Sequence, residues 1–327
     1  MNPYIGHDSQ CHGFEEHRLI GGKGDGMRLL EVNNGRGLEA VVSLDRNADI
    51  ARLRYRGLNL SYFSPCGYVA PPFYEGTGTN WLKSFTAGFL TTCGLQSVGN
   101  PCTDAGEQLP LHGSIANTPT DQAAWEEAHG QLVLRTRTLD ETVFGRKLRL
   151  WRTLEFPLDR NEFTFSDVIE NTGDKEEPFE LLYHMNMGYP LLDEDSVVRI
   201  ASSEVVPRNA HAAAALADWP RMQPPTSGYE ECCYYHTMRD AARGRAAIWQ
   251  PKLSLGLELR YDARLLDCFV EWKMMGVRDY VLGLECGNAY PDGRDVMRQQ
   301  GKLKFLPPGG STHYSVTVRL LDEEPDF

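Results

Sequence analysis

The segment DYVLGLECGN, residues 279–288, has the composition of a buried β-strand that ends in a turn. Because side chains alternate between the two faces of a strand, Val281, Gly283 and Glu285 share one face. A buried carboxylate is costly unless it is paired or borders a cleft, and Gly283 leaves room for another molecule to approach the backbone. The segment therefore predicts either a strand-end glutamate that reaches solvent or a functional carboxylate beside a cleft.

The composition of the whole chain is that of a globular protein with a substantial core. Of its 327 residues 41% are hydrophobic and 24% are charged, and the formal net charge is −12. This negative charge argues against nucleic acid and against anionic membrane surfaces as partners. The polar residues 1–18 lack the apolar core of a signal peptide, and no apolar run approaches membrane-spanning length. We therefore expect a cytoplasmic protein.

The eight cysteines show no C-x-x-C pair and no regular spacing. In a cytoplasmic protein this distribution favours reduced thiols that mostly fill the core. Zinc-binding sequences place their cysteines and histidines at characteristic short spacings, which are missing here. We therefore expect no metal site.

The rest of the chain indicates strand after strand. Residues 1–26 are interpreted as a loose N-terminal arm, and residues 27–327 as a single domain. The segments KLRLWRTLEF and EFTFSDVIEN alternate between apolar and polar residues and predict a hairpin that turns at residues 157–161. Residues 199–225 look irregular, with a short helix expected near residues 211–217. The pattern predicts an all-β fold, a large antiparallel β-sandwich with few short helices.

Two histidines are candidates for chemistry. In FELLYHMNMGYP, residues 179–190, His184 and Asn186 share one face of the expected strand, so this face borders either solvent or a cleft. Histidine is the side chain best suited to proton transfer near neutral pH, although such a residue is more often only hydrogen-bonded. His112, in the phrase LPLHGS, lies in a loop between strands.

The order of these motifs along the chain is more specific than any one of them. LPLHGS is followed by Trp125, then by LLYHMNMGYP, YVLGLECGN and FLPPGGSTHYSV. This order resembles the galactose mutarotase-like (aldose 1-epimerase) superfamily, over most of the chain from about residue 27 to residue 320. The phrases SLDRNADIARLRYRG and FTAGFLTTCGLQSVGNP are similar to a poorly characterised branch of bacterial aldose-epimerase-like proteins. The resemblance implies a β-supersandwich and a sugar as ligand.

The resemblance also implies roles for particular residues. His184 takes the place of the family's general acid, Glu285 that of its general base, and His112 that of a histidine that holds the substrate. The arginine that the family has before its LHG motif lacks an obvious counterpart, and Lys83 or Arg46 could replace it. The other substrate-binding candidates are Asn186, the stacking residue Trp272, its neighbour Lys273, and an acidic group from Glu230 or Glu231. Trp81, Phe73 and Tyr74 are further candidates for stacking, although packing in the core is the commoner role for any one such residue.

The function expected from this set is anomer interconversion. Opening a pyranose ring needs a base on the anomeric hydroxyl and an acid on the ring oxygen, and neither a metal nor an organic cofactor. We expect His112, His184 and Glu285 to line one pocket, with His184 and Glu285 on opposite sides of the sugar ring. The alternatives are an isomerase or lyase acting on a modified or acidic sugar, and a sugar-binding protein without catalysis. A small-molecule sugar is the expected partner, and a homodimer is left open.

Overall fold

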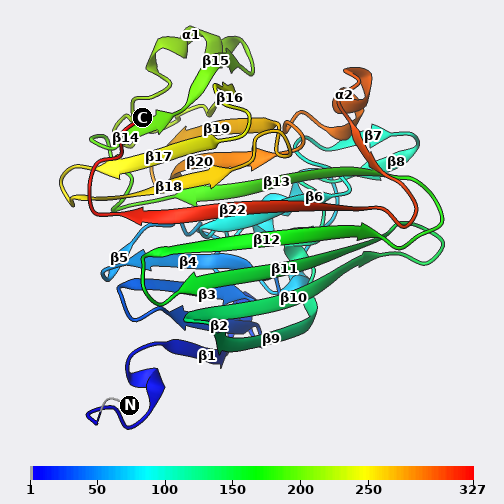
Figure 1. Ribbon diagram of the computed structural model, residues 1–327. Helices are drawn as coiled ribbons and strands as arrows, with labels where there is room; N and C mark the ends of the chain where they lie inside the picture. Colours follow the sequence, from blue (N-terminus) through cyan, green and yellow to red (C-terminus); the bar gives the residue numbers. More distant parts are fainter. Residues whose placement is uncertain (1–2) are drawn as a thin grey trace.

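The computed structural model describes residues 3–327 and consists mainly of antiparallel β-sheets (Figure 1). Strands make up 50% of the structure and helices 10%, which confirms the predicted all-β class. Among the described residues the α-helices are α1 (Ala210–Ala214) and α2 (Arg294–Gln299). Short 3₁₀ turns occur at η1 (Asp8–Gln10), η2 (Gly22–Gly24), η3 (Pro71–Phe73), η4 (Asn80–Ser84), η5 (Ile115–Asn117) and η6 (Leu216–Asp218). Within residues 3–327 no helix combines the length and the apolar character needed to cross a bilayer.

An eight-stranded antiparallel sheet forms one side of the molecule (Figure 1). In spatial order it contains β14 (Val197–Ile200), β17 (Gly244–Gln250), β18 (Leu255–Tyr261), β22 (Ser311–Leu321), β12 (Glu162–Asn171), β11 (Lys147–Pro157), β10 (Gln131–Glu141) and β9 (Thr120–Ala128). β12 alternates strictly between buried and half-buried residues, as its sequence predicts. It pairs antiparallel with β11, which confirms the hairpin expected at residues 157–161.

A seven-stranded sheet forms the second layer. It contains, in spatial order, β15 (Ser202–Pro207), β16 (Cys232–Met238), β19 (Cys268–Met275), β20 (Tyr280–Gly287), β13 (Glu177–Met187) and β21 (Lys304–Leu306), with β6 (Leu90–Leu95) also paired to β13. β13 and β20 are buried along most of their length, because one face packs in the core and the other lies under loops. The central strands of this sheet therefore have no solvent-exposed face.

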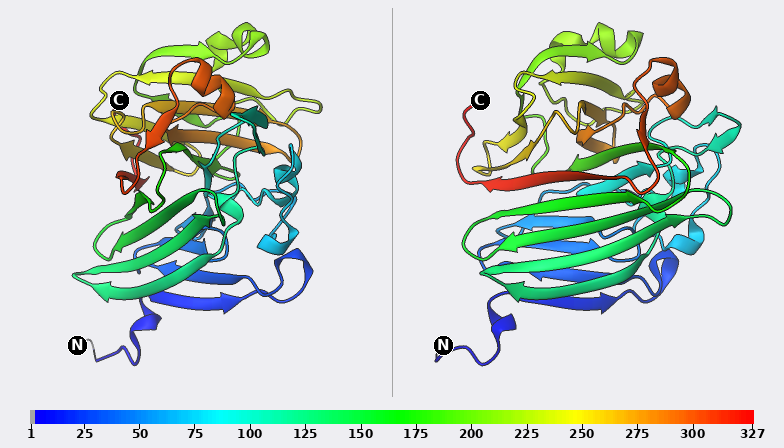
Figure 2. Two further views of the ribbon diagram at one scale, coloured as in Figure 1. Left: turned by 90° about the vertical axis from the view of Figure 1, so that its right-hand side faces the viewer. Right: turned by 45° about the vertical axis from the view of Figure 1, so that its right-hand side comes forward.

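A five-stranded sheet completes the sandwich beside the lower strands of the eight-stranded sheet (Figure 2). It contains β1 (Gly13–Arg18), β2 (Arg28–Asn33), β3 (Leu38–Ser43), β4 (Asp49–Tyr55) and β5 (Leu58–Asn59), and a separate pair is formed by β7 (Cys102–Asp104) and β8 (Glu107–Leu109). One hydrophobic cluster draws on all three large sheets, for example through Val42, Leu150 and Leu284. Burial of these apolar faces against one another supplies the main driving force for the fold.

Two segments differ from the sequence-based interpretation. Part of the expected arm, residues 1–26, forms β1, which pairs antiparallel with β2; residues 1–2 lie outside the described part. The stretch at 199–225, expected to be irregular, includes the end of β14 and all of β15 as well as the expected short helix, which is α1. β1 and β15 are both edge strands, and neither has a fully buried residue, so both lack the regular apolar alternation by which a sequence reveals a strand.

Candidate active site

A cavity of about 580 Å³ lies on the face of the seven-stranded sheet that points away from the core. Alternate residues of β19 and β20 form its floor, and loops around residues 62–66, 81–85 and 99–112 form its walls. Other hollows of the surface are larger or smaller, but this one contains His112, His184 and Glu285 together. The expectation that these three side chains line one pocket is confirmed.

His184 and Glu285 are direct neighbours in the pocket. They are register partners on β13 and β20, where cross-strand Cβ atoms lie about 5 Å apart. Nε2 of His184 is 3.2 Å from Oε1 of Glu285, and the two residues are 6% and 1% exposed. Both groups therefore face the pocket from the same side. The expectation that they lie on opposite sides of a sugar ring is wrong, because adjacent strands of one sheet present their side chains next to each other.

Burial controls the protonation of this pair. It raises the pKa of Glu285 well above its usual range, and the nearby Glu231 carboxylate raises it further against the opposing charge of Arg208. Burial also lowers the pKa of His184 to about 4. The imidazole of His184 is therefore neutral near neutral pH, and burial favours the protonated form of the Glu285 carboxyl beside it.

Gly283 determines where the carboxyl of Glu285 lies. A Cβ atom at residue 283 would come within 2.3 Å of Oε1 of Glu285 and 3.2 Å of Cβ of Trp272. The carboxyl thus folds back over the bare backbone of its own strand. The gap that the sequence predicts at Gly283 is filled by the candidate catalytic group itself.

His112 lies beside the pair with its tautomer fixed by the backbone. The N–H of Gly99 donates to Nδ1 of His112 at 3.2 Å, so the proton of the neutral ring resides on Nε2. Burial, together with His184 and Arg208, lowers the pKa of His112 to about 3. The ring centroid is 4.9 Å from that of Trp81 and 5.9 Å from that of His184. His112 is therefore a neutral hydrogen-bond donor at physiological pH.

Two tryptophans and a glutamate complete this end of the cavity. Nε1 of Trp272 donates to Oε2 of Glu231 at 2.7 Å, which brings both predicted residues to the pocket wall. Trp81 is fully buried, and its Nε1 has no hydrogen-bond partner. Nδ1 of His184 also lacks a hydrogen-bond partner. Oε1 of Glu285 has no hydrogen bond either, although it lies close to Nε2 of His184. Buried polar atoms without partners are uncommon in folded proteins, and these three belong to residues that line the cavity.

Arg208 is the pocket residue that the sequence interpretation missed. It follows β15 directly and lines the cavity. Its Nε donates to Oδ1 of Asp292 at 3.2 Å and its Nη2 to the carbonyl of Pro291 at 2.8 Å, which leaves Nη1 without a partner among the described residues. Tyr235 holds the same Asp292 oxygen through its hydroxyl at 2.6 Å. No local motif marks Arg208, since it reaches the site from an edge of the sheet.

Neither Lys83 nor Arg46, the candidates for the family's arginine, lies in the pocket. The side chain of Lys83 is 58% exposed and forms an ion pair with Glu75 at 3.0 Å. Arg46 is buried elsewhere and donates to the carbonyl of Val69 and to Oδ1 of Asn117. The cation of this pocket is Arg208.

Lys273, Asn186 and Glu230 also lie outside the cavity lining. Lys273 follows Trp272 on β19 and so points to the opposite face, where its Nζ donates to the carbonyls of Asp218, Trp219 and Arg221. Asn186 is fully buried, and its Nδ2 donates to the carbonyl of His184. Glu230 is exposed and pairs with His211.

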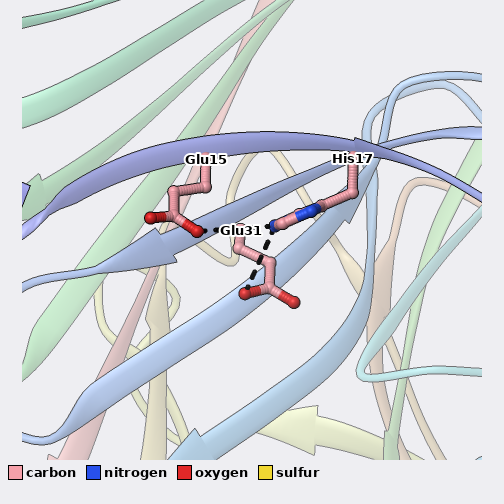
Figure 3. A group of neighbouring side chains, drawn as sticks. All are labelled: Glu15, His17 and Glu31. Atoms are coloured by element: carbon pink, nitrogen blue, oxygen red, sulfur yellow. Dashed lines mark ion pairs between the residues drawn. The ribbon is translucent and has the colours of Figure 1, made fainter.

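A group with metal-ligand chemistry occurs far along the chain from these residues, on the β1–β2 hairpin. Glu15, His17 and Glu31 place their ligand atoms within 4.8 Å of one another (Figure 3). All three side chains are exposed, and His17 pairs with both carboxylates at 3.7 Å. Ion pairing across the strands accounts for this arrangement, since the histidine separates two carboxylates that face each other.

Solved structures define the class of protein to which this fold and site belong. A crystal structure from Klebsiella pneumoniae, described as a "putative aldose 1-epimerase", matches with a TM-score of 0.89 and 26% identity over 97% of this chain and 86% of that chain. A galactose mutarotase-like protein from Clostridium acetobutylicum (TM-score 0.66, 12% identity, 95% and 99% covered) and the galactose 1-epimerase from Lactobacillus acidophilus (0.65, 13%, 96% and 100%) share the fold. The chain thus has the galactose mutarotase-like fold, as its motifs predict.

Within this class, residues 24–320 match a family model described as Domain of unknown function (DUF4432). The match spans most of the chain, and the protein belongs to this family. No curated protein sequence matches it.

Proposed function

We propose that this protein is an aldose 1-epimerase that interconverts the anomers of a free sugar through His184 and Glu285. The observation that carries the proposal is a buried histidine–carboxyl pair, with its side chains 3.2 Å apart, that lines a cavity. Its partner is a small-molecule sugar. The eight unpaired cysteines support a reducing compartment, which we take to be the cytoplasm.

The mechanism follows from the position of the proton. Neutral Nε2 of His184 takes the proton of the anomeric hydroxyl while the Glu285 carboxyl gives its proton to the ring oxygen, and the bond between the anomeric carbon and the ring oxygen breaks. The sugar is now an open-chain aldehyde, with an imidazolium and a carboxylate beside it. Rotation about the adjacent carbon–carbon bond presents the other carbonyl face, and the two transfers reverse as the ring closes.

This geometry suits a hemiacetal because both reacting oxygens are bound to the same carbon. Two groups 3.2 Å apart on one side of the site therefore reach both oxygens at once. The resemblance gives His184 as acid and Glu285 as base, which are their roles in the second half of this cycle. The opposite roles apply in the first half, because burial holds the resting proton on Glu285.

The remaining pocket residues orient the sugar. Nε2–H of His112 and Nε1–H of Trp81 offer hydrogen bonds to sugar oxygens, and Glu231 accepts bonds from hydroxyls. The ring of Trp272 supplies an apolar surface against which the C–H face of a sugar can pack. A non-catalytic binding protein would not need a desolvated acid–base pair, which argues against that alternative.

The test is anomer interconversion over a panel of aldoses, followed by exchange NMR because mutarotation is also spontaneous. Glu285→Gln preserves the shape but neither accepts nor donates the catalytic proton, and we expect the rate to fall about 10²–10⁴-fold. Glu271→Gln is the matched control, since Glu271 is equally buried on the neighbouring strand but faces away from the pocket. Full activity of Glu285→Gln would reject the assignment.

A second candidate function is an isomerase or lyase that acts on an acidic or otherwise modified sugar. The free Nη1 of Arg208 favours it, because a guanidinium binds carboxylates well. Uronic acids in the same panel distinguish the two functions. Turnover of uronic acids alone, abolished by Arg208→Leu, would establish the second function in place of the first.

A further inference from the structure

The acid–base pair occupies only part of the cavity. Glu285 and Val281 lie along the same face of β20, Asp279 directly precedes this strand, and all three line the cavity. At about 3.4 Å per residue, the floor from Glu285 to Asp279 is about 20 Å long. A single sugar ring held at Glu285 therefore leaves the end near Asp279 unfilled.

The volume of the cavity leads to the same conclusion. A free hexose has about 12 non-hydrogen atoms, and at no more than about 30 Å³ each it fills no more than about 360 Å³. The cavity measures about 580 Å³. The difference leaves room for a further group beyond a single hexose.

The far end of the cavity combines apolar walls with one carboxylate. Met274 and Val281 are neighbours on β19 and β20, and Leu82 and the ring of Tyr62 stand above them. The Tyr62 hydroxyl lies 3.3 Å from both Oδ1 of Asp279 and the carbonyl of Arg278. Oδ2 of Asp279 accepts no hydrogen bond from the described residues.

We propose that this far end, lined by Tyr62, Leu82, Met274, Asp279 and Val281, is a second sugar subsite, so that the substrate is a reducing disaccharide or longer saccharide. Apolar and aromatic side chains pack against the C–H faces of a sugar ring, and a carboxylate accepts charge-assisted hydrogen bonds from its hydroxyls. The reducing unit lies at His184 and Glu285, and the second unit lies against Asp279. The proposal rests on the proposed function for the reaction, but not for the binding.

The charge of Asp279 excludes the other occupants of similar size. A wholly apolar substituent would take water from the carboxylate and return no hydrogen bond, which is unfavourable. A group with its own carboxylate or phosphate would be repelled. A neutral group rich in hydroxyls avoids both penalties.

The experiment compares reducing disaccharides with their component monosaccharides. Maltose, cellobiose, lactose and melibiose are tested beside glucose and galactose, by exchange NMR for kcat/KM and by titration calorimetry on Glu285→Gln for affinity. We expect at least one disaccharide to exceed its monosaccharides about tenfold or more in both measures, since hydrogen bonds to a charged group contribute at least this much. Asp279→Ala should lower the disaccharide-to-monosaccharide ratio by a similar factor, whereas Asp174→Ala, in an exposed loop, should not.

The outcomes separate this proposal from the proposed function. If no disaccharide exceeds its monosaccharides, or if Asp279→Ala leaves the ratio unaltered, the second subsite is overturned while the epimerase activity stands. If disaccharides bind through Asp279 but their anomers do not interconvert, the subsite stands and the proposed activity falls. A hexose with an aryl group in place of the second sugar, bound equally well by Asp279→Ala, would overturn the assignment to a sugar.

Discussion

Two neighbouring residues of β13, Tyr183 and His184, point to opposite faces of one sheet and into two buried polar clusters. Tyr183 enters the core between the sheets, where its hydroxyl donates to Oδ2 of Asp167 at 2.8 Å. His184 enters the cavity beside Glu285. Burial is similar on the two sides, so the difference between the clusters lies in their hydrogen bonds.

The core cluster is built around Arg152, whose partners surround it. Its guanidinium donates two hydrogen bonds to Asp167, at 2.8 and 2.7 Å, and one to Asp49 at 2.7 Å. It also donates to the carbonyl of Asn47 and to Oγ1 of Thr92. A buried charge with all its partners in place fixes how the sheets pack and has no capacity left for a ligand.

The pocket cluster leaves polar atoms without partners. Oε1 of Glu285, Nδ1 of His184 and Nε1 of Trp81 are buried without a hydrogen bond. Burial raises the pKa of the Glu285 carboxyl well above its usual range, and the charge of Arg208 opposes this shift only in part. Such atoms destabilise the empty protein. The comparison teaches that satisfied burial marks structure, whereas unsatisfied burial beside a cavity marks a site for a ligand.

The largest effect is expected when His184, the histidine of the pocket cluster, is replaced. We expect His184→Asn to slow anomer interconversion about 10²–10⁴-fold, because the neutral base is lost. The double variant with Glu285→Gln should be little slower than either single variant, since two groups that act as one unit are not additive. Exchange NMR on all three variants tests this. Rate losses that multiply would show that the two residues act independently.

Removal of Arg152 should strongly lower the free energy of unfolding. Arg152→Leu leaves Asp167 and Asp49 buried without their cation, and we expect a loss of about 3–5 kcal/mol in the free energy of unfolding. Urea denaturation measures it. The control is Arg137→Leu, which breaks an ion pair with Asp121 near the surface and should cost far less stability. Equal losses in the two variants would contradict the role given to the core cluster.

Removal of the buried carboxyl from the pocket cluster should raise stability, whereas removal of Arg152 from the core cluster lowers it. The raised pKa of Glu285 means that the native state keeps a proton that the unfolded chain releases above about pH 4.5. Native stability is thereby lost as pH rises towards the native pKa, by up to about 1.4 kcal/mol per pH unit. Glu285→Gln has no such proton. Its advantage over the wild type in urea denaturation should be absent at pH 4 and grow as the pH rises above about 4.5; a constant difference would argue against the raised pKa.

The smallest effects sharpen the assignment of the pocket cation. Arg208→Leu should raise KM about tenfold through loss of a charged hydrogen-bond donor, or about 1.4 kcal/mol. Lys83→Leu should leave kcat/KM unchanged and stability within about 0.5 kcal/mol, since its exposed ion pair contributes little. Steady-state kinetics with one sugar compare the two variants. A larger change in kcat/KM for Lys83→Leu than for Arg208→Leu would indicate that Lys83 contacts the substrate.

Much of the fold could be predicted because alternation is a local property. The hairpin of β11 and β12 and the strand that carries Glu285 are both predicted by the alternation of their own residues. The same rule could have excluded Lys273, because it follows Trp272 on a strand and so cannot share its face. The edge strands β1 and β15 carry no such pattern, and they were missed.

The sequence by itself determined where most of the strands lie, which face of its strand carries His184 and which carries Glu285, and which superfamily the order of motifs resembles. Only the tertiary structure decided that these two side chains touch, that Arg208 and not Lys83 supplies the cation, and that the carboxyl folds over Gly283. The physical reason is that side-chain alternation depends on neighbours along the chain, whereas register, burial and pKa depend on strands that meet only after the whole sandwich has closed.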